Sequence, residues 1–154
     1  MSRMKFVNRF FIFFLLATLA IFFQRGGFLN VNGVTPNLLL IVFLSLILLR
    51  DSITLIISVY LGLLLSAFFV DPFWLMELSL FGPVVVLIAL MRKRFTGNAF
   101  LDLMLMTAVF ELLFYGALSF LHTSALPLFP LFGELVYTVL LGIPLWFAIK
   151  RIEA

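Results

Sequence analysis

Apolar runs separated by short polar breaks occupy nearly the whole chain. Charged residues, glycine, proline or asparagine mark the breaks, and the runs between them are rich in Leu, Phe and Val. Apolar stretches of this length predict helices rather than strands. The expected helices cover about residues 6–23, 36–49, 53–70, 72–91, 99–121 and 131–149. Because no polar stretch remains that could form a separate aqueous unit, we expect residues 1–154 to form one membrane domain.

A polar group at residues 50–52 interrupts the apolar stretch from 36 to 70. A single helix over those 35 residues would be roughly 52 Å long, whereas a bilayer hydrocarbon core is about 30 Å thick. Two helices joined by a tight turn fit better, with Asp51 or Ser52 capping the second one. The first of the two, residues 36–49, is short for a crossing, and a re-entrant segment is the alternative there.

Composition places these helices in a membrane. Hydrophobic residues make up 65% of the chain and charged residues 11%, whereas charged residues account for about 25% of a soluble domain. With six crossings and a cytoplasmic N-terminus, every Lys and Arg except Arg25 falls on the inner side, as is typical of cytoplasmic loops. The sequence therefore predicts an all-α integral membrane protein with six transmembrane helices and both termini in the cytoplasm.

Small and hydroxyl-bearing residues recur every four positions in the third predicted helix, at Thr54, Ser58, Gly62 and Ser66. Such residues fall along one face of a helix, and in lipid they let helix backbones approach closely. We expect this face to point into the bundle. Packing against a neighbouring helix is at least as good an explanation of it as a binding role.

A second polar seam, Thr107, Glu111, Tyr115 and Ser119, follows the fifth predicted helix. Glu111 lies near the middle of the membrane, and no Lys or Arg lies at the middle of another span to pair with it. We therefore expect Glu111 to be protonated, or hydrogen-bonded to Tyr, Ser or Thr across the bundle. A role in function and a role in interhelical hydrogen bonding are equally good interpretations.

The sequence offers little for catalysis or metal binding. Cysteine is absent, and His122 is the only histidine, which makes a poor metal site. An enzyme would have to use Glu111, Glu77 and Glu134 with hydroxyl groups, so it is the weakest hypothesis. We expect no enzyme activity, no cofactor and no metal ion. We also expect no nucleic-acid partner, because the positive charges report topology.

Several stretches together resemble the rod shape-determining protein MreD family of bacteria. They are a basic start before a short first helix, PNLLLIVFLSLILLRD, GLLLSAFFVDP with Gly62 and Pro72, RKR, and YTVLLGIPLWFAIKR with Pro144. The likeness covers nearly the full chain. Two positions depart from the family pattern, since Ser66 stands where an acid is common and Trp74 stands where glycine is usual.

The resemblance implies a multi-pass protein of the bacterial plasma membrane that belongs to the cell-elongation machinery. Such proteins act with MreC and help connect the cytoplasmic MreB filament to the enzymes that insert new peptidoglycan. No catalysis is implied. A chain with almost no mass outside the bilayer acts through its helix faces and short loops, so the small-residue face and the inner basic clusters are candidate contact surfaces.

The same resemblance brings an alternative, because MreD-like proteins are similar in fold to the substrate-binding components of energy-coupling factor vitamin transporters. Those components show alanines spaced AxxxA on the first helix, whereas this chain reads ATLA. A carrier also needs polar groups gathered in one outer pocket. The candidates for such a pocket are Glu77, Glu134, Tyr137 and Trp74. We favour the scaffold hypothesis over the carrier.

Overall fold

The structure is a computed structural model that describes residues 6–49, 52–70, 72–123, 125 and 127–153, without the side chains of 70, 72–74, 152 and 153. The helices found within these ranges are α1 (Phe6–Arg25), α2 (Leu38–Leu48), α3 (Ile53–Val70), α4 (Pro72–Met91), the 3₁₀ turn η1 (Arg92–Arg94), α5 (Ala99–Leu121) and α6 (Leu128–Glu153). The only β structure among the described residues is an isolated bridge between Val31 and Val34. The fold is therefore all-helical.

Three helices, α3, α4 and α5, have the bounds predicted from the sequence. α1 runs two residues further than expected, and α2 is shorter than the predicted 36–49 at both ends. α6 begins three residues earlier than predicted, which places Pro130 at its third position. Proline is tolerated in a first helical turn because the backbone N–H it lacks has no intrahelical partner there.

Four helices, α1, α4, α5 and α6, are long and apolar enough to cross a membrane, and the α4 span continues into η1. The protein is therefore a multi-pass membrane protein. α2 is different, because its 11 residues extend only about 16 Å. That is roughly half the thickness of a hydrocarbon core.

α2 forms the centre of the bundle. Every residue from Leu38 to Ile47 is buried, and α2 contacts α1, α3, α4, α5 and α6. A helix that is hydrophobic on all sides belongs in such a position. Its one polar side chain, Ser45, donates a hydrogen bond to the Ile41 carbonyl at 2.8 Å, so it places no unsatisfied hydroxyl in the core.

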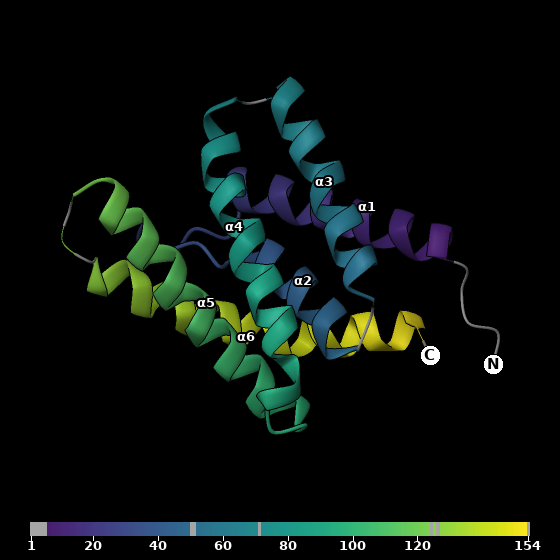
Figure 1. Cartoon of the computed structure of the whole chain (residues 1–154). Helices are drawn as coiled ribbons and strands as arrows, with labels where there is room; N and C mark the ends of the chain where they lie inside the picture. The colour runs from purple at the N-terminus through teal and green to yellow at the C-terminus, as the bar shows by residue number, and fades with distance from the viewer. Residues whose placement is uncertain (1–5, 50–51, 71, 124, 126, 154) are drawn as a thin grey trace.

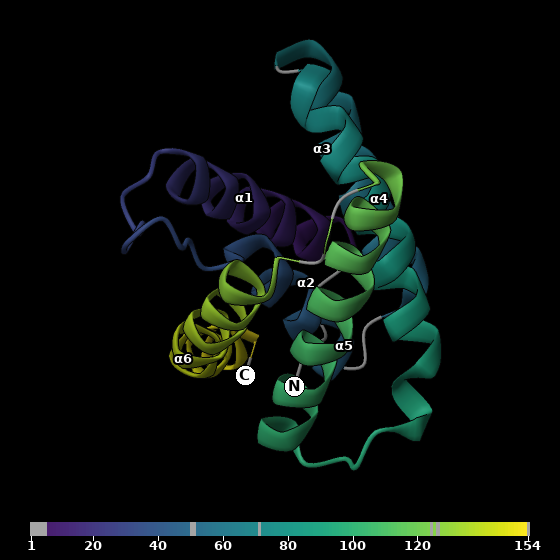
Figure 2. The same cartoon turned by 90° about the vertical axis from the view of Figure 1, so that its left-hand side faces the viewer.

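The axes of the helices around α2 follow two main directions. α1 and α6 run across the direction of α4, and the start of α1 lies on the same side of the molecule as the end of α6 (Figure 1). In the view along α6, α4 and α5 lie beside each other and the far end of α3 rises above the other helices (Figure 2). That end exposes apolar side chains, including Phe69 at 82%.

The small-residue face of α3 points into the bundle only at its centre. A Cβ at Gly62 would lie 3.0 Å from the Phe14 ring of α1, so the two helices pack closely there. Thr54 and Ser66 are exposed and Ser58 is half-buried, so the prediction of an inward face is wrong at both ends. The Ser58 and Ser66 hydroxyls donate to backbone carbonyls one turn earlier in α3. The hydrogen bonds of these two hydroxyls therefore stay within α3.

A glycine that the sequence did not single out joins α3 to α4. The Tyr60 ring lies against Gly82, where an added Cβ would be 2.0 Å from its Cζ atom. The Tyr60 hydroxyl, at the tip of this ring, donates a hydrogen bond to the Leu78 carbonyl of α4 at 3.1 Å. The absence of a side chain at Gly82 is what allows this contact.

Candidate functional site: a polar cavity at the start of the central helix

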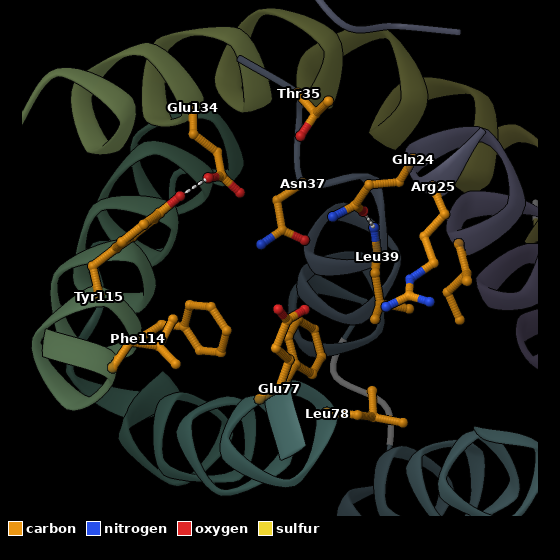
Figure 3. A pocket seen from close by; sticks show the side chains of 13 residues that line it. Gln24, Arg25, Thr35, Asn37, Leu39, Glu77, Leu78, Phe114, Tyr115 and Glu134 are labelled. Atoms are coloured by element: carbon orange, nitrogen blue, oxygen red, sulfur yellow. Dashed lines mark hydrogen bonds between the residues drawn. The ribbon is translucent and has the colours of Figure 1, made fainter. Parts of the chain in front are cut away.

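A cavity of about 380 Å³ lies at the N-terminal end of α2, between α1, α4, α5 and α6 (Figure 3). Its volume falls within the usual range of small-molecule sites. Its polar lining residues are Gln24, Arg25, Thr35, Asn37, Glu77, Tyr115 and Glu134. Its apolar lining residues are Ile21, Leu39, Leu78, Phe81, Phe114 and Leu118. Because α2 begins only at Leu38, the space beyond its first turn remains open to side chains from four other helices.

The floor of the cavity is the capped N-terminus of α2. The Asn37 side chain accepts a hydrogen bond from the Leu40 N–H at 3.1 Å, which is the usual role of asparagine at an N-cap. The Asn37 backbone N–H donates to the Thr138 hydroxyl of α6 at 2.8 Å. The Leu39 N–H donates to the Gln24 carboxamide of α1 at 3.5 Å. Polar groups from α1 and α6 therefore fix where α2 starts.

Glu134 and Tyr115 form one side wall of the cavity. The Tyr115 hydroxyl of α5 donates to Oε2 of Glu134 on α6. Both side chains are half-buried, and Figure 3 shows them together on one side of the opening. This hydrogen bond fixes the orientation of the Glu134 carboxyl toward the cavity.

Glu77 approaches from another wall. It comes from α4, its side chain is exposed, and its carboxyl points toward the middle of the cavity (Figure 3). Arg25, from the end of α1, lies on the far side of Leu39 from the Tyr115–Glu134 pair. Arg25 and the Tyr115–Glu134 pair therefore lie on opposite sides of the cavity, with the Glu77 carboxyl between them in this view (Figure 3).

Glu111 lies one turn before Tyr115 on α5 and is fully buried, with 0% exposure. Neither of its carboxyl oxygens has a hydrogen-bond partner of regular geometry. Asn37 and Glu134, which both line the cavity, are the polar groups that interact with it electrostatically. The expected hydrogen bond to Tyr, Ser or Thr is absent, because Tyr115 donates to Glu134 and Thr107 donates to the Leu103 carbonyl of its own helix.

Two of the four residues predicted for an outer pocket, Glu77 and Glu134, line this cavity. Tyr137 is half-buried on α6 but is not part of the lining. The side chain of Trp74 lies outside the described part of the chain. Asn37 is not among the residues predicted for the site, although the order proline, asparagine and apolar run is a recognisable start of a helix.

A second cavity, of about 440 Å³, lies at the other end of α2. Arg92 and Lys93 of η1 line it together with Asp102 of α5. The Asp102 carboxylate accepts hydrogen bonds from the Thr96 N–H, the Thr96 hydroxyl and the Gly97 N–H at 2.7–2.9 Å. Asp102 therefore holds the loop before α5 in place.

The chemistry of the first cavity is that of a binding site. It combines carboxyl, hydroxyl, carboxamide and guanidinium groups with aromatic walls, the mixture that orients a small ligand. Within the described ranges, no group of three or more His, Cys, Asp or Glu side chains is placed to hold a metal ion. Comparison of the chain with protein-family models, curated proteins and solved structures finds no match.

Proposed function

We propose that the chain is a membrane scaffold of the bacterial cell-elongation machinery, which links an MreC-like protein and the MreB filament to peptidoglycan synthesis. The observation that carries the proposal is the role of the segment PNLLLIVFLSLILLRD, which is one part of the MreD resemblance. Its apolar part forms α2, which every other helix of the bundle contacts. The residues behind the resemblance are therefore those that organise the fold.

The distribution of mass also supports a scaffold. Nearly all described residues belong to helices or to short connections between them, and the outward helix faces carry many large apolar side chains. A protein of this kind has little surface outside the bilayer and contacts its partners mainly through helix faces. We propose the plasma membrane as its location.

The proposed topology has six crossings with both termini in the cytoplasm. Arg92–Arg94 and the pair Lys150 and Arg151 then lie on the inner side, and Arg25 lies on the outer side, as the positive-inside rule requires. α2 crosses although it is short, because its outer end meets the polar cavity rather than lipid. The cavity then opens to the outer face of the membrane.

Affinity purification tests the scaffold proposal. The tagged full-length protein is extracted from its native membrane in mild detergent, and the recovered proteins are identified by mass spectrometry. We expect an MreC-like protein and cell-wall synthesis enzymes to be enriched over a control purification with an unrelated multi-pass protein. Recovery of a transmembrane coupling subunit with ATPases instead would overturn the proposal.

The second candidate is a substrate-binding component of an energy-coupling factor type vitamin transporter. The cavity favours it, since Glu77 and Glu134 converge there with Tyr115. The first helix argues against it, because Ala17 and Ala20, the small residues nearest to a coupling motif, are 0% and 6% exposed and face the core. A coupling partner has no access to them, so the scaffold remains the better proposal.

A further inference from the structure

We propose that the cavity at the start of α2 binds a small organic cation, an amine or an amidine carried on an apolar body. Glu134 and Glu77 are the groups that recognise the charge. The proposal holds for a scaffold and for a carrier alike, because it concerns the ligand and not the partner proteins. Neither proposed function requires a ligand of this charge.

The positions of the two acids carry the first part of the argument. Glu77 from α4 and Glu134 from α6 point into the same opening from different walls (Figure 3). Two carboxyl groups held apart in this way can each accept a hydrogen bond from one cationic nitrogen group between them. The Tyr115 hydroxyl holds the Glu134 carboxyl in place. The Glu134 side chain therefore does not have to be ordered when a ligand binds.

The apolar walls favour an organic ligand over a simple ion. Phe81 of α4 and Phe114 of α5 both line the cavity. Each of them packs on the buried ring of Phe110, with ring centroids 5.0 Å and 5.3 Å apart. The two rings are therefore held in place, and aromatic faces attract cations as well as apolar groups.

Glu111 is the second, independent observation. Burying a polar group without a hydrogen-bond partner is costly, and this carboxyl is fully buried with none. It interacts electrostatically with Asn37 and Glu134, which line the cavity. Glu111 therefore adds a polar group next to the cavity whose hydrogen-bonding capacity the protein itself does not fill.

The remaining charges decide where the cation lies. Arg25 is separated from the Tyr115–Glu134 pair by Leu39 (Figure 3). The positive end of α2 is already used, because Gln24 and Asn37 accept hydrogen bonds from its first N–H groups. The cationic group therefore belongs between Glu134 and Glu77, and the apolar body belongs against Phe81 and Phe114.

Binding to the purified full-length protein in detergent tests the proposal. The probes are benzamidine and tyramine, and the matched control is benzamide, which has nearly the shape of benzamidine and no charge. Isothermal titration should give saturable binding of at least one cation and at least tenfold weaker binding of benzamide. Equal affinity for benzamidine and benzamide, or no saturable binding of either cation, would overturn the proposal.

Variants then locate the site. Replacing both acids, as Glu77→Gln with Glu134→Gln, keeps side-chain size and hydrogen-bonding capacity and removes the charges. We expect the affinity for the bound cation to fall about tenfold or more. Arg94→Gln, in η1 beyond the opposite end of α4, is the control and should change the affinity less than twofold. Unchanged affinity in the double variant would refute the assignment, and a monodisperse size-exclusion profile shows that the variant is folded.

Discussion

The Tyr115 hydroxyl donates a hydrogen bond to the Glu134 carboxyl and joins α5 to α6 at the wall of the cavity. The two helices also meet through apolar contacts, but this is the polar contact that involves a cavity residue from each of them. Both residues stand out in the sequence as polar positions in apolar helices. That they are partners is visible only in the fold.

Tyr115→Phe should destabilise the protein, because Glu134 loses its donor while remaining half-buried. We expect a loss of about 1–2 kcal/mol, measured as a lower midpoint of thermal unfolding in detergent. Tyr137→Phe is the matched control, since Tyr137 is also half-buried on this side of the bundle and makes no described hydrogen bond. Equal midpoints for the two variants would contradict the role of the Tyr115 hydroxyl.

Thr138→Val should loosen the start of α2. The substitution keeps the shape of the side chain but removes the acceptor of the buried Asn37 N–H, at a cost of about 1–3 kcal/mol. The control is Thr107→Val, because Thr107 is equally buried but its hydroxyl bonds only within its own helix. Hydrogen exchange at the Asn37 amide should become faster in Thr138→Val and stay unchanged in Thr107→Val. The same exchange rate in both variants would show that Thr138 does not hold α2.

Gly82→Ala should disturb the contact between α3 and α4. Its new Cβ would lie 2.0 Å from Cζ of Tyr60, so the ring has to move away and its hydrogen bond to the Leu78 carbonyl is lost. We expect a destabilisation of about 1–3 kcal/mol. Gly116→Ala on α5 is the control, since nothing lies within 4 Å of its added Cβ, and it should be neutral or slightly stabilising. The measurement is the midpoint of thermal unfolding, which should be lower for Gly82→Ala than for Gly116→Ala. Equal midpoints would show that Tyr60 does not pack on Gly82.

The local part of the fold is readable from the sequence, and the arrangement around α2 is not. The hydroxyl of Ser52 accepts a hydrogen bond from the Leu55 N–H, three residues later, as expected of a helix cap. This interaction is local and does not depend on distant residues. Asn98 likewise caps α5. In contrast, lipid tails and leucine side chains are equally apolar, so hydropathy does not distinguish a helix surrounded by lipid from α2, which is surrounded by protein.

The candidate site was predictable only in the polar residues that interrupt its apolar helices, such as Tyr115. Glu77 and Glu134 stand out because acids are rare in apolar helices. Gln24 and Asn37 are neutral residues near helix ends, and their roles arise from contacts between α1 and α2. The cavity itself exists because α2 starts late, at Leu38, a length that the apolar run from residue 36 to 49 does not reveal.

Glu111→Met distinguishes a structural role of the buried acid from a functional one. Neither carboxyl oxygen has a hydrogen-bond partner of regular geometry, and methionine removes a buried polar group at similar size. We therefore expect the free energy of unfolding to stay the same or to increase by up to about 1–3 kcal/mol. The measurement is the midpoint of thermal unfolding, which should be unchanged or higher. Cation binding in the cavity should weaken in the same variant, because Asn37 and Glu134, which line the cavity, lose the polar group with which they interact. A clear loss of stability would instead identify Glu111 as a residue that holds the helices together, and unchanged cation binding would remove it from the site.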